Sequence, residues 1–195
     1  MSEIPEMTFE KLIHTYIRAK DENRPHLLAC TFSPDAVLEM TVNATTIDFP
    51  PVTKGLVAIT GILRDFSRTY ENIYTFCLAH PWLVAIEDPH YSFDWMVGMS
   101  EKNSGNVYVG CGRYDWYRCK SSGLIDQFKI TIEEMPVLPG ECLQPVLGWL
   151  TGIPYPWCTA NEITKTAPDI ELLKPVIKYI NRMDITKADK QLPAS

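Results

Sequence analysis

The stretch GRYDWYRCKSSGLIDQFKITI, residues 112–132, has the pattern of two β-strands joined by a tight turn. On both sides of the turn, aromatic and β-branched residues alternate with charged or polar ones, which is typical of strands with one buried face. Ser121, Ser122 and Gly123 are turn-forming residues, and so short a connection makes the two strands antiparallel. The stretch therefore predicts a β-hairpin packed on a core.

Strands are predicted for most of the segment from Ile73 to Met135, which is rich in aromatic and β-branched residues and is divided by turn signals such as DPH and KNSG. The strands are expected at residues 73–80, 82–88, 91–100, 106–120 and 124–134. A further strand is expected at 36–42, where Leu38 and Met40 alternate with Glu39. Because the connections are short, the sheet should be curved and mostly antiparallel.

Helices are predicted near the beginning of the chain. Within residues 8–21, apolar residues recur at spacings of three and four, the pattern of a helix with one buried face. A second, short helix is expected through Leu27, Leu28 and Phe32, followed by a turn at 33–35. A third is expected within 54–70. Helices first and strands later predict an α+β fold rather than alternating βαβ units.

The segment after Met135 has a different composition, because it contains eight of the fifteen prolines of the chain. Its residues 142–157 are apolar and aromatic, so they should pack on the domain, on a second subunit or over the mouth of a pocket. A helix is expected at 167–183, beginning at Pro168 and kinked at Pro175, and 186–195 are expected to form a frayed tail. The expected division is a domain at 1–135 and a Pro-rich C-terminal extension at 136–195.

Composition excludes several classes of function. With 195 residues and 46% hydrophobic content the chain can bury one sizeable core. A formal charge of -6 without clustered Lys and Arg argues against binding to nucleic acid or to an anionic membrane. The N-terminus has no signal-peptide pattern and no apolar run approaches the roughly 18 residues of a membrane span, so a soluble, cytoplasmic protein is expected.

Cofactor motifs are absent from the sequence. The six cysteines include no C-x-x-C pair and the four histidines have no metal-ligand spacing, so no metal site is expected. Glycine-rich phosphate-binding motifs are also absent, so no bound cofactor is expected.

The order of elements, with SPDAVLEM at 33–40 and the hairpin at 112–132, resembles the nuclear transport factor two-like superfamily. Within it, the chain is most similar to SnoaL-like polyketide cyclases and ketosteroid isomerases, over about residues 8–135. The resemblance implies a cone-shaped domain in which N-terminal helices and a strongly curved sheet enclose one deep, largely apolar pocket. It also implies a homodimer.

The same resemblance implies two catalytic residues. The oxyanion-hole tyrosine of the ketosteroid isomerases falls on Tyr16, in TYIRAKD, and their oxyanion-hole aspartic acid falls on Asp115, in RYDWYRCKSSG. The general base of that family falls on Met40, which cannot accept a proton. The resemblance therefore implies an oxyanion site without the usual base.

The alternation of the strand around Asp115 leaves two placements open. If the odd-numbered residues face inward, Asp115 lies in a dry pocket, where desolvation raises the pKa of its carboxyl group and nearby Arg113 lowers it. In the other placement, Asp115 is a surface carboxylate paired with Arg113 or Arg118, and Tyr16 is a core tyrosine. With the inward placement, the expected pocket-lining residues are Leu38, Met40, Trp95, Arg113, Tyr117, Phe128 and Ile130.

The expected function is that of a cofactor-independent cyclase, isomerase or dehydratase acting on a small hydrophobic carbonyl or polycyclic compound. Asp115 would be the acid or hydrogen-bond donor and Tyr16 would stabilise an oxyanion. The alternative is a non-catalytic small-molecule-binding, dimerisation or docking module of the same fold, which the methionine at position 40 favours.

Overall fold

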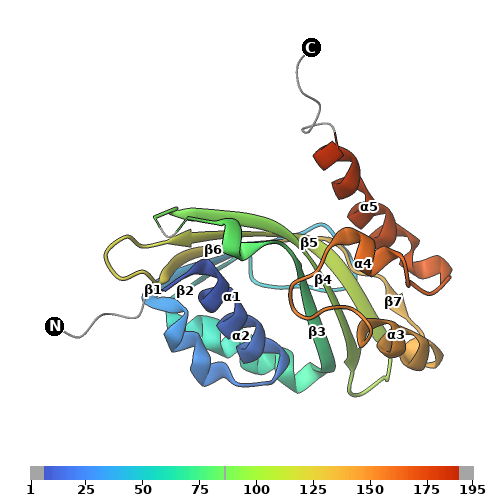
Figure 1. The fold of residues 1–195 in the computed structure, drawn as a ribbon. Coiled ribbons are helices and arrows are strands. Elements are labelled where there is room, and N and C mark those ends of the chain that lie inside the picture. Colours follow the sequence, from blue (N-terminus) through green and yellow to red (C-terminus); the bar gives the residue numbers. More distant parts are fainter. Residues whose placement is uncertain (1–6, 86, 189–195) are drawn as a thin grey trace, which may run out of the picture.

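The computed structural model describes residues 7–85 and 87–188, and it has the predicted α+β fold. Figure 1 shows α1 and α2 together against one face of a strongly curved sheet, with the C-terminal helices gathered near the other end of the strands. The α-helices are α1 (Phe9–Asp21), α2 (Leu56–Thr69), α3 (Leu143–Leu150), α4 (Ala160–Thr164) and α5 (Lys174–Ala188). The short 3-10 helices are η1 (Pro25–Cys30), η2 (Pro81–Leu83), η3 (Gly140–Cys142) and η4 (Glu171–Leu173).

The sheet has seven strands in the order β2-β1-β6-β5-β4-β3, and β7 pairs with β5 beside this path. All pairs are antiparallel except β1 with β6, so the expectation of a mostly antiparallel sheet is confirmed. The strands are β1 (Phe32–Val42), β2 (Val52–Lys54), β3 (Tyr70–Leu78), β4 (His90–Glu101), β5 (Val107–Arg118), β6 (Ile125–Glu134) and β7 (Val137–Leu138).

The predicted first helix is confirmed as α1, and its sequence explains both its start and its orientation. The Thr8 side chain accepts a hydrogen bond from the Lys11 amide at 3.3 Å, which satisfies one of the free N–H groups of the first turn. Leu12, Ile13 and Ile17 are fully buried on one face of the helix. This amphipathic face holds α1 against the sheet.

Two predicted elements are wrong. Phe32 does not end the second helix but begins β1, because it pairs with Ile125 of β6 and buries its ring in the core, and the turn expected at 33–35 is an irregularity within that strand. The strand expected at 82–88 is also absent from the described part of that segment. The segment begins within η2, whose first residue, Pro81, supplies no N–H for a ladder, and Trp82 and Leu83 are exposed.

Aromatic side chains fill the interior of the cone. Trp116 is stacked on Phe128 with ring centroids 3.7 Å apart, and Tyr16 meets Trp116, Phe128 and Tyr114 edge-on. Such edge-to-face and stacked pairs add to the stabilisation that burial alone provides. The aromatic cluster joins α1 to the centre of the sheet.

The C-terminal extension, which the structure describes from residue 136 to 188, packs against the outer face of the same sheet. Phe76, Met96 and Val109 on that face form a second apolar core with Trp149 and Leu150 of α3. Packing on the domain was one of the three locations left open by the sequence.

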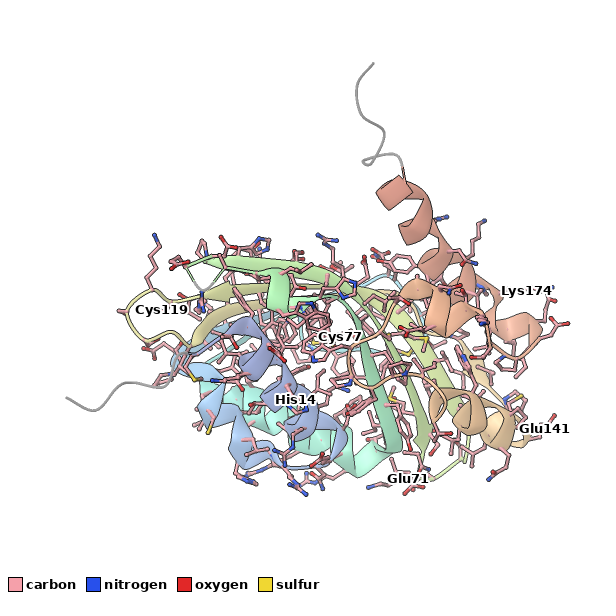
Figure 2. All side chains as sticks on the ribbon, viewed as in Figure 1. His14, Glu71, Cys77, Cys119, Glu141 and Lys174 are labelled. Carbon is pink, nitrogen blue, oxygen red and sulfur yellow. The ribbon has the colours of Figure 1, made fainter. Side chains whose placement is uncertain are left out.

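Two close contacts fix this docking. A Cβ on Gly98 would lie 2.3 Å from Leu150 Cδ1, so the glycine lets α3 approach β4 closely. On β3, the Cys77 amide donates a hydrogen bond to the Pro156 carbonyl at 2.7 Å, and the Cys77 carbonyl accepts one from the Cys158 amide at 3.1 Å. Cys77 lies in the middle of the molecule, far from Cys119 in the hairpin turn (Figure 2).

The helix expected at 167–183 begins later, at Lys174, with Pro175 in its first turn, where a missing N–H costs nothing. The predicted tail at 186–195 lies outside the described residues from 189 onward. Within the described ranges, no helix is both long and apolar enough to span a bilayer.

Candidate functional site

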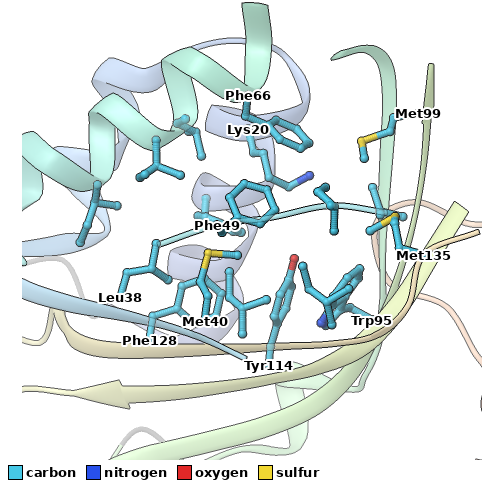
Figure 3. Close-up of a pocket in the computed structure, with 18 of the residues that line it drawn as sticks. Lys20, Leu38, Met40, Phe49, Phe66, Trp95, Met99, Tyr114, Phe128 and Met135 are labelled. Atoms are coloured by element: carbon cyan, nitrogen blue, oxygen red, sulfur yellow. The ribbon is translucent and has the colours of Figure 1, made fainter. Parts of the chain in front are cut away.

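A cavity of about 70 Å³ lies inside the cone, between the two N-terminal helices and the inner face of the sheet (Figure 3). Its wall is almost entirely aliphatic, aromatic or thioether in character. The lining residues are Tyr16, Lys20, Phe32, Leu38, Met40, Ile47, Phe49, Ile59, Ile62, Leu63, Phe66, Trp95, Val97, Met99, Tyr114, Phe128, Ile130, Ile132 and Met135.

Many of the residues expected at a pocket line this cavity. Tyr16 reaches it from α1, Leu38 and Met40 from β1, Trp95 from β4, and Phe128 and Ile130 from β6. On β1 and on β6 the two positions differ by two in number, so their side chains share the inner face.

Asp115, Arg113 and Tyr117, expected at the pocket in the inward placement, do not line the cavity, so that placement is wrong and the outward alternative holds. These three side chains lie on the outer face. There the Asp115 carboxylate lies 3.6 Å from Arg113 Nε and 3.5 Å from His90 Nε2, and it accepts a hydrogen bond from Ser92 Oγ. Asp115 is thus a surface carboxylate paired with Arg113, and it has no contact with the cavity.

The inner face of β5 belongs instead to Tyr114 and Trp116, which are 3% and 0% exposed. Burying two large aromatic rings removes more apolar surface from water than burying Arg113 and Tyr117 would, and it leaves the charges of Arg113 and Asp115 near solvent. Trp116 packs on Tyr16 and Phe128, so the N-terminal helix and β6 together fix the orientation of the strand.

Two tyrosine hydroxyls give the cavity polar character. The rings of Tyr16 and Tyr114 meet at 6.3 Å, and Figure 3 shows the Tyr114 hydroxyl pointing into the cavity. Burial raises the pKa of Tyr16 far above its ordinary value of 10.0, and the nearby Asp21 carboxylate raises it further. Burial also raises the pKa of Tyr114 well above 10.0. Both hydroxyls therefore stay protonated and can donate hydrogen bonds.

Lys20 is a further polar group of the cavity wall, and its side chain is nearly buried. Its ammonium lies 2.7 Å from Asp21 Oδ1, donates to Thr75 Oγ1 and lies 5.3 Å from the centre of the Phe66 ring. The other oxygen of Asp21 accepts from the Thr75 amide at 2.7 Å and from the Tyr155 hydroxyl at 2.8 Å. A residue of the C-terminal extension thus helps to hold the partner of a cavity lysine.

Sequence reasoning missed Tyr114 and Lys20. Lys20 follows Tyr16 by four residues on α1, so the helical period places the two side chains on the same face. Tyr114 shares its parity with Trp116, so both face inward only if Asp115 faces outward, which was one of the two placements left open. The helical spacing was therefore a usable signal for Lys20, whereas alternation alone did not identify the inner face that carries Tyr114.

The chemistry available in the cavity is hydrogen-bond donation within an apolar wall. None of its lining residues carries a carboxylate or an imidazole, so the wall offers no ordinary general base. Across residues 7–85 and 87–188, no group of three or more His, Cys, Asp or Glu side chains is placed to hold a metal ion.

Comparisons with known proteins give similarity at the level of fold. No protein-family model matches the sequence, and a search of curated proteins gives no significant match. The hexachlorocyclohexane dehydrochlorinase LinA-type3 from Novosphingobium barchaimii is 11% identical to this chain. The match has a TM-score of 0.54 and covers 68% of this chain and 89% of that one.

Two further solved structures are similar. A protein with a ketosteroid isomerase-like fold from Catenulispora acidiphila has 13% identity and a TM-score of 0.49, over 62% of this chain and 83% of that one. A nuclear transport factor two-like protein of unknown function from Exiguobacterium has 15% identity and a TM-score of 0.49, over 63% of this chain and 98% of that one.

Proposed function

We propose that this chain, which has the nuclear transport factor two-like fold, binds a small hydrophobic carbonyl compound in its cone cavity. We propose further that it isomerises, cyclises or dehydrates this compound without a cofactor. One observation carries this proposal. The polar groups on an otherwise apolar wall are the hydroxyls of Tyr16 and Tyr114, the ammonium of Lys20 and the indole N–H of Trp95, and all four are donors. A carbonyl oxygen is the acceptor that such a set suits.

The two tyrosines would act on the carbonyl oxygen. As an enolate forms, negative charge collects on that oxygen, and donors that already point at it in a dry site stabilise the charge without reorganising. The raised pKa values of both hydroxyls mean that neither loses its proton to the enolate. Removal of one such donor typically lowers turnover by roughly 10²-fold or more.

The size of the cavity restricts the substrate. An apolar cavity of about 150 Å³ is large enough to hold benzene. At about 70 Å³, the present cavity matches an acyclic carbonyl compound of a few heavy atoms. Larger compounds would require movement of the wall, and the flexible side chains of Met40, Met99 and Met135 are suited to such movement. A polycyclic substrate therefore fits this cavity less well than a monocyclic or acyclic one.

A non-catalytic binding protein is the second candidate, and it is favoured by the absence of carboxylates and imidazoles among the lining residues. Met40 stands where a base was expected. In the catalytic proposal the base must then come from solvent or from the substrate, whereas a binding protein needs none.

Proton exchange separates the two candidates. Small ketones are incubated with the protein in D₂O, and loss of the α-proton signals is followed by NMR, while binding is measured separately by calorimetry. The catalytic proposal predicts faster exchange that falls by roughly 10²-fold in Tyr114→Phe. Tyr117→Phe is the matched control, since Tyr117 lies on the outer face of the same strand.

Each outcome decides between the proposals. If Tyr114→Phe leaves the rate of proton exchange unchanged, the cavity is not the catalytic site. Binding that weakens in Tyr114→Phe, without any exchange, would establish the second candidate. If no small carbonyl compound binds at all, both are rejected. The expected homodimer stays a prediction, which sedimentation equilibrium tests directly.

A further inference from the structure

Lys20 offers the cavity more than a hydrogen-bond donor, because its side-chain nitrogen becomes a nucleophile when it loses a proton. We infer that Lys20 captures small aldehydes covalently, by forming an imine between its side-chain nitrogen and the aldehyde carbon. This inference rests on the proposed binding of carbonyl compounds and adds a substrate class to it. Figure 3 shows the Lys20 ammonium on the helix side of the cavity, beside Phe66, and the Tyr114 hydroxyl rising from the sheet side.

Burial makes the placement of this lysine unusual. Its side chain is only 9% exposed, and an ammonium taken out of water must be compensated by a partner charge. Asp21, itself 3% exposed, provides that charge at 2.7 Å, and Thr75 accepts a further hydrogen bond. A lysine of the same helix that served only solubility would point outward, as Lys11 does.

The Asp21 carboxylate fits the whole course of imine formation. It takes a proton from the ammonium, and the free nitrogen lone pair forms a bond with the carbonyl carbon. The carbonyl oxygen, which gains two protons in the sequence, leaves as water when its bond to carbon breaks. The ammonium and aldehyde thus become a protonated imine and one water molecule. No oxidant or reductant is needed.

Electrostatics favour the product in this site. The ammonium and the protonated imine each carry one positive charge, so the ion pair with Asp21 is present both before the reaction and after it. Hydrolysis of an imine requires water, and an apolar wall keeps the concentration of water at the imine carbon low. The Tyr16 and Tyr114 hydroxyls can donate to the carbonyl oxygen while the carbon is attacked.

The size of the cavity selects aldehydes over ketones. The intermediate has a tetrahedral carbon that bears nitrogen, oxygen and the substituents of the carbonyl compound. An aldehyde brings one carbon substituent to this centre and a ketone brings two, which about 70 Å³ accommodates less readily. A straight-chain aldehyde such as butanal extends from Lys20 along the apolar wall.

Reductive trapping tests the inference. The full-length protein is mixed with one molar equivalent of butanal and with cyanoborohydride, which reduces an imine to a stable butyl-lysine, and the label is located by peptide mass spectrometry. We expect the label on Lys20 in preference to the exposed Lys11. Lys20→Arg keeps the charge beside Asp21 but forms no stable imine, so the label at position 20 should be lost completely.

The outcomes separate this inference from the proposed function. Calorimetry with butan-2-one measures noncovalent binding in the cavity, and this measurement does not depend on the formation of an imine. If butan-2-one binds and Lys20 is not labelled, covalent capture is rejected and the binding function stands. If butan-2-one does not bind and labels spread over exposed lysines, both are rejected. Labelling of Lys20 that butan-2-one suppresses supports both together.

Discussion

Substitution of Asp21 by asparagine should destabilise the fold severely, although Asp21 is the last residue of α1 and the next residue, Glu22, is the C-cap of the helix. The Asp21 carboxylate accepts hydrogen bonds from the Thr75 amide, the Thr75 hydroxyl and the Tyr155 hydroxyl, and it pairs with the Lys20 ammonium. Asparagine removes the charge and leaves the ammonium buried without a counter-charge. Breaking a buried ion pair in this way costs about 3–5 kcal/mol.

The magnitude can be measured against a matched control. Asp65 pairs with Arg68, one turn further along α2, at 3.0 Å, but both of these side chains are more than 70% exposed. Such a surface pair contributes about 0–1 kcal/mol. Urea denaturation followed by circular dichroism should therefore give a large loss of unfolding free energy for Asp21→Asn and almost none for Asp65→Asn.

A double variant tests the cause of the loss. If the unpaired Lys20 charge is responsible, Asp21→Asn combined with Lys20→Met should be more stable than Asp21→Asn alone, since the double variant buries no charge at either position. The reasoning is refuted if Asp21→Asn lies within about 1 kcal/mol of the wild type, as a surface pair would. It is also refuted if Lys20→Met adds to the loss instead of relieving it.

Three further predictions concern the outer face, the extension and the cavity tyrosines. Asp115→Asn should change stability by about 1 kcal/mol or less in urea denaturation and should leave ketone binding unaltered, because its partners lie outside the cavity; weaker binding would contradict its placement. Leu150→Ala should cost about 2–5 kcal/mol in the same assay, since this side chain is 1% exposed and packs on Gly98; a cost near zero would mean that the extension is not docked. The pKa values of Tyr16 and Tyr114 are raised in the folded state, so the folded protein holds these protons more tightly than the unfolded chain and stability should fall as pH rises above about 10; urea denaturation should show a shallower fall in the Tyr114→Phe variant, and an identical fall would refute the assigned burial.

Local patterns in the sequence were sufficient for much of the fold. The apolar period of residues 8–21 predicted α1 and its buried face, and the alternation in 112–132 predicted the β5–β6 hairpin. The same alternation correctly grouped Leu38 with Met40 on the cavity side of β1. These features depend on neighbouring residues only, because backbone geometry sets a period near 3.6 in helices and 2 in strands.

The outer face of β5 shows why alternation can mislead. Val107, Val109 and Cys111 are apolar on this face, whereas Arg113 and Asp115 further along the same face are polar. The outer face is apolar where the C-terminal extension covers it and polar where it does not, since the extension packs only on the first part of the strand. With both faces of the strand partly apolar, the sequence of the strand alone does not distinguish inside from outside.

The sequence by itself thus determined which side chains share a face, and the tertiary structure decided which face encloses the cavity. Tyr114 and Trp116 turn inward because Tyr16 and Phe128, from α1 and β6, pack against them. Lys20 is held at the cavity because Thr75 and Tyr155, from two distant parts of the chain, meet its neighbour Asp21. Burial of these side chains depends on such distant contacts, and no local period encodes it.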